Sequence, residues 1–338
     1  IACEEGTYQS ATGQTSCNIA DAGHYVSFIS GIAQTLQSPC PAGTYNVNTG
    51  SVNSSDCINA DIGFYVPTTG QSSQIECMSG TYQPTTGQSA CIDADTGHYV
   101  ESTGQSSQIA CEEGTYQSAT GQTSCNLADP GYYVELTGQS SQTACRAGSY
   151  NANVGSKSST DCLSASVGHY VASPAQTIQT ECPTGTYQPA TGQSSCINAS
   201  AGYYVALYTQ TTQTECLAGT YQPASGQSSC IDADIGHYVA STGQSTQKEC
   251  LAGTYQENTG QSYCDNSDIG HYVPTSGQST QTPCNAGTYQ SASGQTSCIE
   301  ADEGYYVDGD AATSQTACGE GSNSVGTGSS DASDCIED

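Results

Sequence analysis

Cysteine is the residue type with the clearest chemistry in this chain of 338 residues. Its 20 cysteines recur at gaps that alternate between 14 (or 17) residues and 20 residues (once 23). No Cys-x-x-Cys pair and no histidine at zinc-ligand spacing accompanies them, so the pattern favours disulfides over zinc. Disulfides persist in oxidising surroundings, and the pattern therefore predicts an extracellular protein, secreted or held at a cell surface.

A second feature predicts which cysteines pair. Cys216 and Cys230 lie three residues before and eleven residues after Gly219, and 17 residues later the same two places hold Ala233 and Gln247. All nine cysteine-free copies have Gln at the second place, and all but one have Ala at the first: Ala20 and Gln34, Ala60 and Gln74, Ala94 and Gln108, Ala128 and Gln142, Ala165 and Gln179, Ala199 and Gln213, Ala233 and Gln247, Ser267 and Gln281, Ala301 and Gln315.

Both kinds of copy are therefore expected to form the same turn, closed by a disulfide in one and by a glutamine bonded to the backbone in the other. This predicts local bridges: Cys3–Cys17, Cys40–Cys57, Cys77–Cys91, Cys111–Cys125, Cys145–Cys162, Cys182–Cys196, Cys216–Cys230, Cys250–Cys264, Cys284–Cys298 and Cys318–Cys335. The alternative joins Cys17 to Cys40, and so on along the chain, around each cysteine-free copy. That alternative ignores the Ala/Gln correspondence.

Histidine and the acidic residues also recur at fixed places. The five histidines share one slot, Gly-His-Tyr, as His24, His98, His169, His237 and His271, and Phe64, Tyr132, Tyr203 and Tyr305 fill that slot in other copies. Phenylalanine can be neither a metal ligand nor a general base, so the slot predicts a surface or stacking role.

Paired acids precede the same glycine, and Asp93, Asp95, Asp232 and Asp234 are weak candidates for calcium ligands. Glu300 and Asp302 are a further such pair, whereas Ser166 and Ser200 replace the acid in two copies. Turn capping is therefore the favoured reading, with no cofactor expected and calcium as the alternative.

Other chemistry is sparse. No nucleophile–base pair, phosphate-binding loop or basic patch is present, and the three-residue insertions near Asn48–Asn53, Asn153–Ser158 and Val325–Ser330 are loops of Ser, Gly and Asn. We therefore expect that the chain is not an enzyme. Asn53-Ser-Ser and Asn198-Ala-Ser match the acceptor sequence for N-glycosylation, and Ser/Thr density allows O-glycans.

The elements that must position these residues form a repeat. The unit is 34 residues long, made of two 17-residue halves, and it predicts one continuous array over residues 1–338 that continues beyond both ends. Its ten repeats are 1–39, 40–76, 77–110, 111–144, 145–181, 182–215, 216–249, 250–283, 284–317 and 318–338.

The fold class follows from the same composition. Trp is absent and Phe occurs twice, so no ordinary core can form and disulfides must compensate. In each half, Gly-Thr-Tyr-Gln and Gln-Ser-Ser-Cys are expected to be two short strands joined by a turn such as Pro-Ala-Ser-Gly. We expect a small, disulfide-rich, all-β fold in which tandem hairpins stack, tyrosine on tyrosine, into an elongated solenoid-like rod.

The stretch CLAGTYQPASGQSSC, residues 216–230, resembles the cysteine-rich domains of tumour necrosis factor receptors and the related ephrin-receptor-like cysteine-rich repeats. These share its C-x-x-G-T-Y opening. The resemblance implies a single local disulfide in each module and modules that stack into an elongated ectodomain. The present chain departs from both families in lacking intertwined disulfides and in its greater regularity.

Charge and repetition together indicate the function. Three basic residues against 32 acidic ones give a net charge of −29, which repels nucleic acid and anionic membranes. We expect an extracellular structural protein, a filament or stalk subunit that associates with itself, carries glycans and does not insert into a membrane. The alternative is the ectodomain of a receptor or adhesin, with or without calcium.

Overall fold

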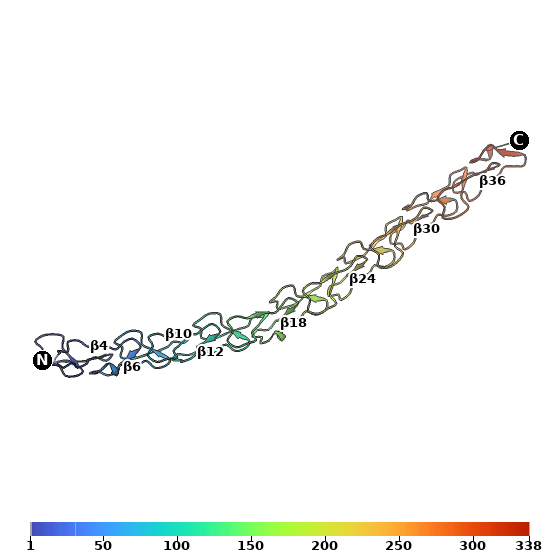
Figure 1. Cartoon of the computed structure of the whole chain (residues 1–338). Helices are drawn as coiled ribbons and strands as arrows, with labels where there is room; N and C mark the ends of the chain where they lie inside the picture. The colour runs from blue at the N-terminus through green and yellow to red at the C-terminus, as the bar shows by residue number, and fades with distance from the viewer. Residues whose placement is uncertain (1, 31, 338) are drawn as a thin grey trace. The chain divides into compact units, whose positions relative to one another are not determined.

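The computed structural model describes residues 2–30 and 32–337 as a succession of short hairpins in chain order (Figure 1). The contacts divide the chain into two units. One reaches to Leu163 and includes Ser173–Ile178, and the other comprises Ser164–Ala172 and the chain from Gln179 onward. The predicted all-β fold of small, disulfide-rich hairpin repeats is confirmed in both units.

The hairpins of the first unit are antiparallel pairs, nearly all of two-residue strands. They are β1 (Thr7–Tyr8) with β2 (Asn18–Ile19), β3 (His24–Tyr25) with β4 (Ser38–Pro39), β5 (Thr44–Tyr45) with β6 (Ile58–Asn59), β7 (Phe64–Tyr65) with β8 (Ile75–Glu76), β9 (Thr81–Tyr82) with β10 (Ile92–Asp93), β11 (His98–Tyr99) with β12 (Ile109–Ala110), β13 (Thr115–Tyr116) with β14 (Asn126–Leu127), and β15 (Tyr132–Tyr133) with β16 (Thr143–Ala144). Then come β17 (Ser149–Tyr150) and β18 (Leu163–Ser164).

The second unit continues the pattern. Its pairs are β19 (His169–Tyr170) with β20 (Thr180–Glu181), β21 (Thr186–Tyr187) with β22 (Ile197–Asn198), β23 (Tyr203–Tyr204) with β24 (Thr214–Glu215), β25 (Thr220–Tyr221) with β26 (Ile231–Asp232), β27 (His237–Tyr238) with β28 (Lys248–Glu249), β29 (Thr254–Tyr255) with β30 (Asp265–Asn266), β31 (His271–Tyr272) with β32 (Thr282–Pro283), β33 (Thr288–Tyr289) with β34 (Ile299–Glu300), β35 (Tyr305–Tyr306) with β36 (Thr316–Ala317), and β37 (Ser322–Ser324) with β38 (Cys335–Glu337).

The second strand of each hairpin is not the one that the sequence predicts. Gln-Ser-Ser-Cys was expected to pair with Gly-Thr-Tyr-Gln, but Thr220 and Tyr221 pair with Asp232 and Ile231, which follow the cysteine. The reason is that the side chain of Gln222 donates a hydrogen bond of 2.8 Å to the carbonyl of Ser229. The Ser-Ser segment therefore wraps around this glutamine and is not free to form a strand.

The buried core is a series of Cys, Ala, Val, Gln and Asn side chains, not the predicted stack of tyrosines. The residue three before each leading glycine (the Gly of a Gly-x-Tyr motif) is buried, as Cys77 before Gly80 and Ala94 before Gly97. The residue three after it is buried as well, except Gln9 in the first half, which is half-buried. The tyrosines, which precede this second buried position, are only half-buried, because successive strand residues point to opposite faces.

Successive halves are joined mainly by backbone hydrogen bonds, with a few side-chain bonds such as the one that Asn151 Nδ2 donates to Tyr132 O (3.2 Å). From the half of Gly80 to that of Gly97, Gly80 N–H donates to Val100 O (2.8 Å) and Ala94 N–H to Gly80 O (2.9 Å). Across the next junction, Gly97 N–H donates to Gln117 O (2.7 Å) and Cys111 N–H to Gly97 O (2.8 Å). Disulfide-closed and cysteine-free halves therefore present the same hydrogen-bonding edges to their neighbours.

Glycine is required at the leading position for a steric reason. A Cβ on Gly63 would collide with the carbonyl oxygen of Gly104, which lies two halves further along the chain, in the turn of that half. The residue in that turn, seven after the leading glycine, has positive φ and is nearly always glycine. The exceptions are Ala175, Thr209 and Ala311, which are the non-glycine residues with positive φ among those described. The first cysteine-free half, with its longer loop, instead has Ser30 at this place, without a positive φ.

Candidate functional site: disulfide-closed and clasped turns

The cysteines pair within their own halves, in the ten local pairs that the Ala/Gln correspondence predicts. The pairs are Cys3–Cys17, Cys40–Cys57, Cys77–Cys91, Cys111–Cys125, Cys145–Cys162, Cys182–Cys196, Cys216–Cys230, Cys250–Cys264, Cys284–Cys298 and Cys318–Cys335, with Cα–Cα separations of 5.6–5.8 Å. These separations are ordinary for a disulfide. The first cysteine of a pair is generally buried and the second half-exposed, so each bridge links the core to the surface of its turn.

A buried glutamine fills most disulfide-closed turns. Gln83 is 3% exposed; its Nε2 donates to the carbonyl of Ala90 (2.8 Å), and its Oε1 accepts from the backbone N–H of Thr85 (3.1 Å). The amide therefore satisfies backbone groups on both sides of the loop, as a buried polar side chain must. Gln117, Gln188, Gln222, Gln256 and Gln290 make the same two kinds of contact.

A different glutamine closes each cysteine-free turn. Oε1 of Gln108 accepts from the backbone N–H of Asp95 (2.6 Å), and its Nε2 donates to Oδ2 of the same aspartate (2.7 Å). We call this pair of bonds the clasp. It occurs with Asp21–Gln37, Asp61–Gln74, Asp95–Gln108, Asp129–Gln142, Asp234–Gln247, Asp268–Gln281 and Asp302–Gln315.

The predicted bond from glutamine to backbone is thus present, with one correction of position. In the first cysteine-free half the clasp is made by Gln37 and not by Gln34. The cause is the longer gap of 23 residues before Cys40, which moves the clasp three residues along the chain. Gln34 corresponds instead to Gln105 of a later half. The backbone carbonyl of Gln34 accepts from Gln9 N–H (2.9 Å), as that of Gln105 accepts from Gln83 N–H (3.0 Å).

Two halves carry a reduced clasp. Gln179 and Gln213 accept from the backbone N–H groups of Ser166 and Ser200 (both 2.7 Å), and these serines supply no carboxylate for the glutamine Nε2. The bond to the backbone is therefore the constant part, and the bond to the aspartate adds to it where an aspartate is present.

The calcium candidates have partners of their own in these turns. The carboxylates of Asp95 and Asp234 belong to clasps, while Asp93 and Asp232 lie over the turn glycines Gly121 and Gly260, two halves further along the chain. Glutamate at the same place bonds to that turn, as when Glu76 accepts from the hydroxyl of Thr103 (2.9 Å). Within residues 2–30 and 32–337, no three His, Cys, Asp or Glu side chains are grouped as metal ligands.

The histidine slot makes one recurring contact. In all five, His24, His98, His169, His237 and His271, Nδ1 lies 3.0–3.4 Å from the carbonyl oxygen two residues earlier. The residue across the hairpin varies from copy to copy; it is Ala110 beside His98 and Glu249 beside His237. The slot therefore shows a local surface contact and no shared chemical partner.

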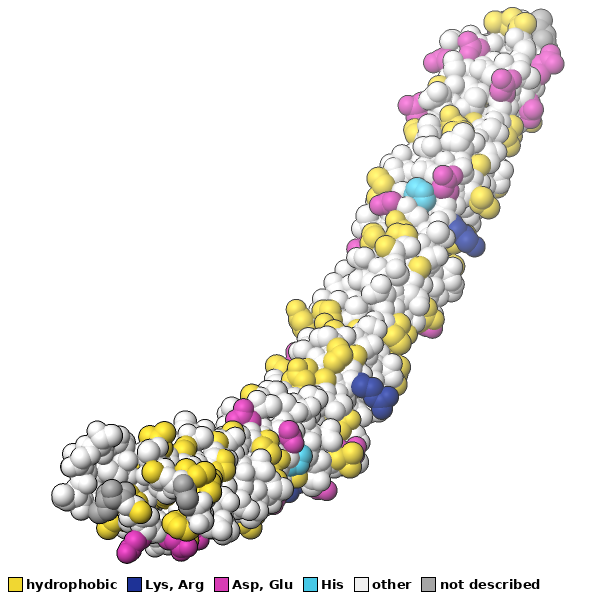
Figure 2. Space-filling view, turned by 60° about the vertical axis from the view of Figure 1, so that its left-hand side comes forward, with side chains coloured by type: hydrophobic (Ala, Val, Ile, Leu, Met, Phe, Trp, Pro, Cys, Tyr) yellow, Lys and Arg dark blue, Asp and Glu magenta, His cyan; other side chains and the backbone are white. Residues whose placement is uncertain are grey.

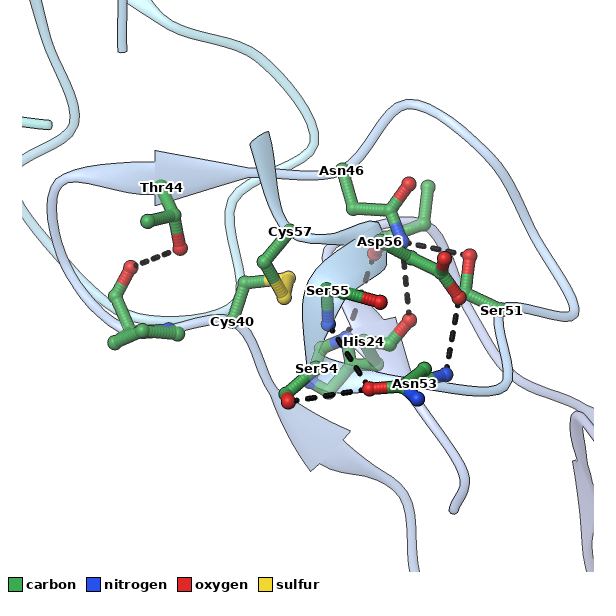
Figure 3. Close-up of a disulfide and its surroundings, with 12 residues drawn as sticks. His24, Cys40, Thr44, Asn46, Ser51, Asn53, Ser54, Ser55, Asp56 and Cys57 are labelled. Carbon is green, nitrogen blue, oxygen red and sulfur yellow. Dashed lines mark hydrogen bonds between the residues drawn. A yellow bond between two sulfur atoms is a disulfide. The ribbon is translucent and has the colours of Figure 1, made fainter. Parts of the chain in front are cut away.

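Three disulfide-closed halves contain an insertion that forms a turn of 3₁₀-helix: η1 (Ser54–Asp56), η2 (Ser159–Asp161) and η3 (Ala332–Asp334). Figure 3 shows the first, beside the Cys40–Cys57 bridge. Asn53 accepts from Ser55 N–H (3.1 Å), and Asp56 accepts from the backbone N–H of Asn53 (3.0 Å), which makes a capping box. These predicted loops are self-contained polar caps.

Hydrogen bonding or burial shifts the pKa of Asp331, Tyr203 and Tyr255. Donation by the backbone N–H of Ser333 (2.7 Å) holds the pKa of Asp331, the N-cap of η3, below its ordinary value. The hydroxyl of Tyr203 donates to Glu215 (3.2 Å), which raises the pKa of this tyrosine because its anion would face a carboxylate. Burial raises the pKa of Tyr255, and nearby carboxylates add to the shift.

The two glycosylation sequons have different surroundings. Asn53 is exposed on the inserted loop and uses only its Oδ1 in the cap. Asn198 belongs to β22, and its carboxamide lies against the turn at Gly226, two halves further along the chain. Both asparagines are exposed.

The kind of residue buried three after the leading glycine also alternates along the sequence, and the sequence-based prediction made no use of this. The buried residue three after the leading glycine is Val in the cysteine-free halves, as Val100, and Gln or Asn in most disulfide-closed ones, as Gln83 and Asn46. This alternation has the same 34-residue period as the cysteines. It identifies the halves that need a polar side chain to hold a loop from inside.

Comparison with models of known protein families gives no match for this chain. Comparison with curated proteins gives none either. Among the described residues, no helix has the length and apolar character of a membrane span. The disulfides are the feature that bears on location, and they indicate an oxidising, extracellular or secretory environment.

Proposed function

We propose that this chain is an extracellular structural protein, the repetitive part of a filament or stalk that associates with copies of itself. The observation that carries the proposal is the sameness of the junctions. The junction from the half of Gly80 to that of Gly97 and the junction from the half of Gly97 to the next use backbone donors and acceptors in the same arrangement. The first begins at a disulfide-closed half and the second at a cysteine-free half. Such an array can be extended without designing a new contact, as in other repeat proteins.

The turns support the same function by their chemistry. Each is closed by a covalent bridge or by a clasp, and the side chains that could have been catalytic are engaged in turns or vary between copies. Repetition favours multivalent contact with a second repetitive chain, in which individually weak contacts add. The resemblance to receptor cysteine-rich repeats belongs to the same proposal, as a shared way of building an ectodomain from small stacked modules.

The test is electron microscopy of the native material together with the purified chain. We expect filaments or stalks that contain the chain, and association of the purified chain that increases with salt, because salt screens the repulsion between copies of charge −29. If the chain stays monomeric at every ionic strength and is found only on single membrane-anchored receptors, the receptor or adhesin reading replaces this one. Circular dichroism is expected to be unchanged by a calcium chelator, and a loss of signal would make the acids ligands.

A further inference from the structure

The disulfides divide the chain into closed loops and the linkers between them. Each bridge joins cysteines 14 residues apart, or 17 in three halves, and the next cysteine follows after 20 residues, or 23 after Cys17. Tension along the backbone passes through a bridge, so the residues inside the loop bear no load. The capped insertions η1, η2 and η3 all lie inside such loops. Only the linkers, each of which holds one cysteine-free half, are able to lengthen.

Each repeat therefore has a covalent limit to its length. A linker of 20 residues spans at most about 70 Å when fully extended, and a bridge adds the 5.6–5.8 Å between its two Cα atoms. Without the bridge, the same 34-residue repeat would span about 120 Å. The disulfides thus hold the extended repeat to roughly two thirds of the length of the reduced one.

The clasp keeps a linker short until it opens. Gln142 accepts from Asp129 N–H (2.7 Å) and donates to Oδ2 of Asp129 (2.6 Å), and these bonds join two residues that are 13 positions apart in one linker. Hydrogen bonds break under a tension that leaves a covalent bridge intact. The closed loops keep their inner bonds, such as that from Gln117 to the Ser124 carbonyl (2.9 Å). An opened linker therefore refolds between turns that are already formed, with short loops to close.

Two consecutive cysteine-free halves, those of Ser166 and Ser200, have the weakest turns and are here called the weak halves. Both serines offer the clasp glutamine only a backbone N–H. The turns of the same halves contain Ala175 and Thr209, with φ of +61° and +60°. This left-handed conformation is unfavourable for a residue with a Cβ, and most of all for a β-branched one. The backbone bonds to neighbouring halves are of ordinary length, as from Thr209 N–H to Cys182 O (3.0 Å), so the weakness belongs to the turns.

The weak halves are also almost free of charge. Acidic side chains are spread over the face of the chain that Figure 2 shows, but between Asp161 and Glu215 the sequence has only Glu181, and no Lys or Arg. Repulsion between acids therefore contributes little to the opening of these two halves. Because salt acts by screening such repulsion, their opening should hardly depend on salt.

We propose that the chain lengthens under tension in separate steps, in which cysteine-free halves open and the disulfides set the limit. The weak halves open at a lower force than the clasped halves on either side of them, those of Asp129 and Asp234. The proposal rests on the proposed structural role, in which the chain bears tension, but it does not require self-association. It adds a function to that role, which is extension under load to a fixed length.

The first experiment stretches single full chains between their two ends. The fully stretched chain should measure roughly 700 Å when oxidised and roughly 1,200 Å after reduction. The oxidised chain should lengthen in separate steps before it reaches its limit. A single rupture that releases the whole length at once would refute stepwise extension.

A second experiment closes chosen halves with new disulfides, verified by peptide mapping. The test variant staples both weak halves: Ala165→Cys with Gln179→Cys, and Ala199→Cys with Gln213→Cys. The control staples the clasped neighbours: Ala128→Cys with Gln142→Cys, and Ala233→Cys with Gln247→Cys. Each variant should lose two steps and shorten the stretched chain by about 90 Å. We expect the steps lost from the test variant to be those at lower force, at low and high salt alike. Equal forces, or the reverse order, would overturn the proposal.

Hydrogen exchange tests the same order without tension. The amides of Ser166 and Ser200 donate to clasp glutamines, as those of Asp129 and Asp234 do. We expect protection factors about tenfold lower at the two serines, because opening of their turns breaks fewer bonds. Ser166→Asp should raise the protection of its own amide and leave that of Ser200 unchanged. Equal protection at all four amides of the unmodified chain would contradict the proposed order.

The outcomes also separate this proposal from the function on which it rests. Filaments in the native material, together with a single rupture of the stretched chain, would refute stepwise extension and leave the structural role intact. Stepwise extension of a chain that occurs only on single membrane-anchored receptors would refute the filament and leave the extension in place.

Discussion

Gln108 holds Asp95 at two points, accepting from its backbone N–H at 2.6 Å and donating to its carboxylate at 2.7 Å. In the preceding half, the place of Gln108 is taken by Cys91, which is bonded to Cys77. A pair of hydrogen bonds and a covalent bond therefore close the same turn in alternate halves. The relative strength of the two closures is open to measurement.

Replacing the clasp glutamine is expected to open its turn locally. Gln108→Ala removes one bond to the backbone and one to a carboxylate, both exposed, which predicts a loss of about 1 kcal/mol. Hydrogen exchange at the Asp95 amide should become roughly five-fold faster. Gln105→Ala is the control, since the Gln105 side chain bonds only within its own turn. Gln179→Ala should have a smaller effect, because Ser166 offers only its backbone N–H.

The clasp shows what the sequence could predict and what it could not. The period, the disulfide pairs and the role of glutamine at the place of cysteine follow from recurrence, since equivalent positions must serve one backbone. The strand formed by Ile231 and Asp232 could not be predicted from recurrence, because its position depends on the hydrogen bond from Gln222 to the Ser229 carbonyl inside the loop. The sequence analysis also wrongly expected the tyrosines to be buried. A strand of two residues is too short to show the alternation of apolar and polar residues that identifies the buried face of a strand.

A new disulfide should form where a clasp now stands. Ala94 and Gln108 occupy the places of Cys77 and Cys91, so the double variant Ala94→Cys, Gln108→Cys is expected to oxidise spontaneously. A loop of about 15 residues predicts a gain of roughly 3 kcal/mol, and the loss of the clasp reduces the net gain to about 2 kcal/mol. Intact mass and peptide mapping without reductant check the bridge, and chemical denaturation checks the gain. A bridge from either new cysteine to Cys91 or Cys111 would show that the two kinds of half are not equivalent.

Thr209 has φ of +60°, in a turn position that is glycine in most halves. A left-handed conformation costs a β-branched residue about 1–2 kcal/mol, and part of this is offset by the greater freedom of glycine in the unfolded chain. Thr209→Gly should therefore stabilise the second unit by about 0.5–1 kcal/mol, seen as a higher Tm in calorimetry. The reverse change in the same unit, Gly243→Thr, should lower it. A fall in Tm with Thr209→Gly would mean that the threonine side chain makes a favourable contact.

The η3 loop should loosen in acid. The pKa of Asp331 is lowered from 3.8 by the hydrogen bond from Ser333, so its contribution to stability is present above pH 3.8 and is lost as pH falls through the lower folded pKa. The amide signal of Ser333 in NMR should move, and its exchange should quicken, over that acidic range. Asp331→Asn is the matched control, because Asn53 caps the equivalent turn of η1 without an ionisable group. An unchanged acid response in that variant would assign the effect to another residue.

The alternation of cysteine-bearing and cysteine-free halves also matters while the chain is still reduced. If every half carried both cysteines, the second cysteine of one half would stand three residues before the first of the next. Four other thiols would then lie within one half-repeat (17 residues) of each thiol inside the array. Loop-closure entropy distinguishes loops of such similar length poorly. As built, a thiol has its native partner 14 or 17 residues away and its nearest wrong partner at least 20 residues away, on the far side of a turn that glutamine can close by itself. The cysteine-free half thus acts as an insulator that protects the fidelity of oxidative folding.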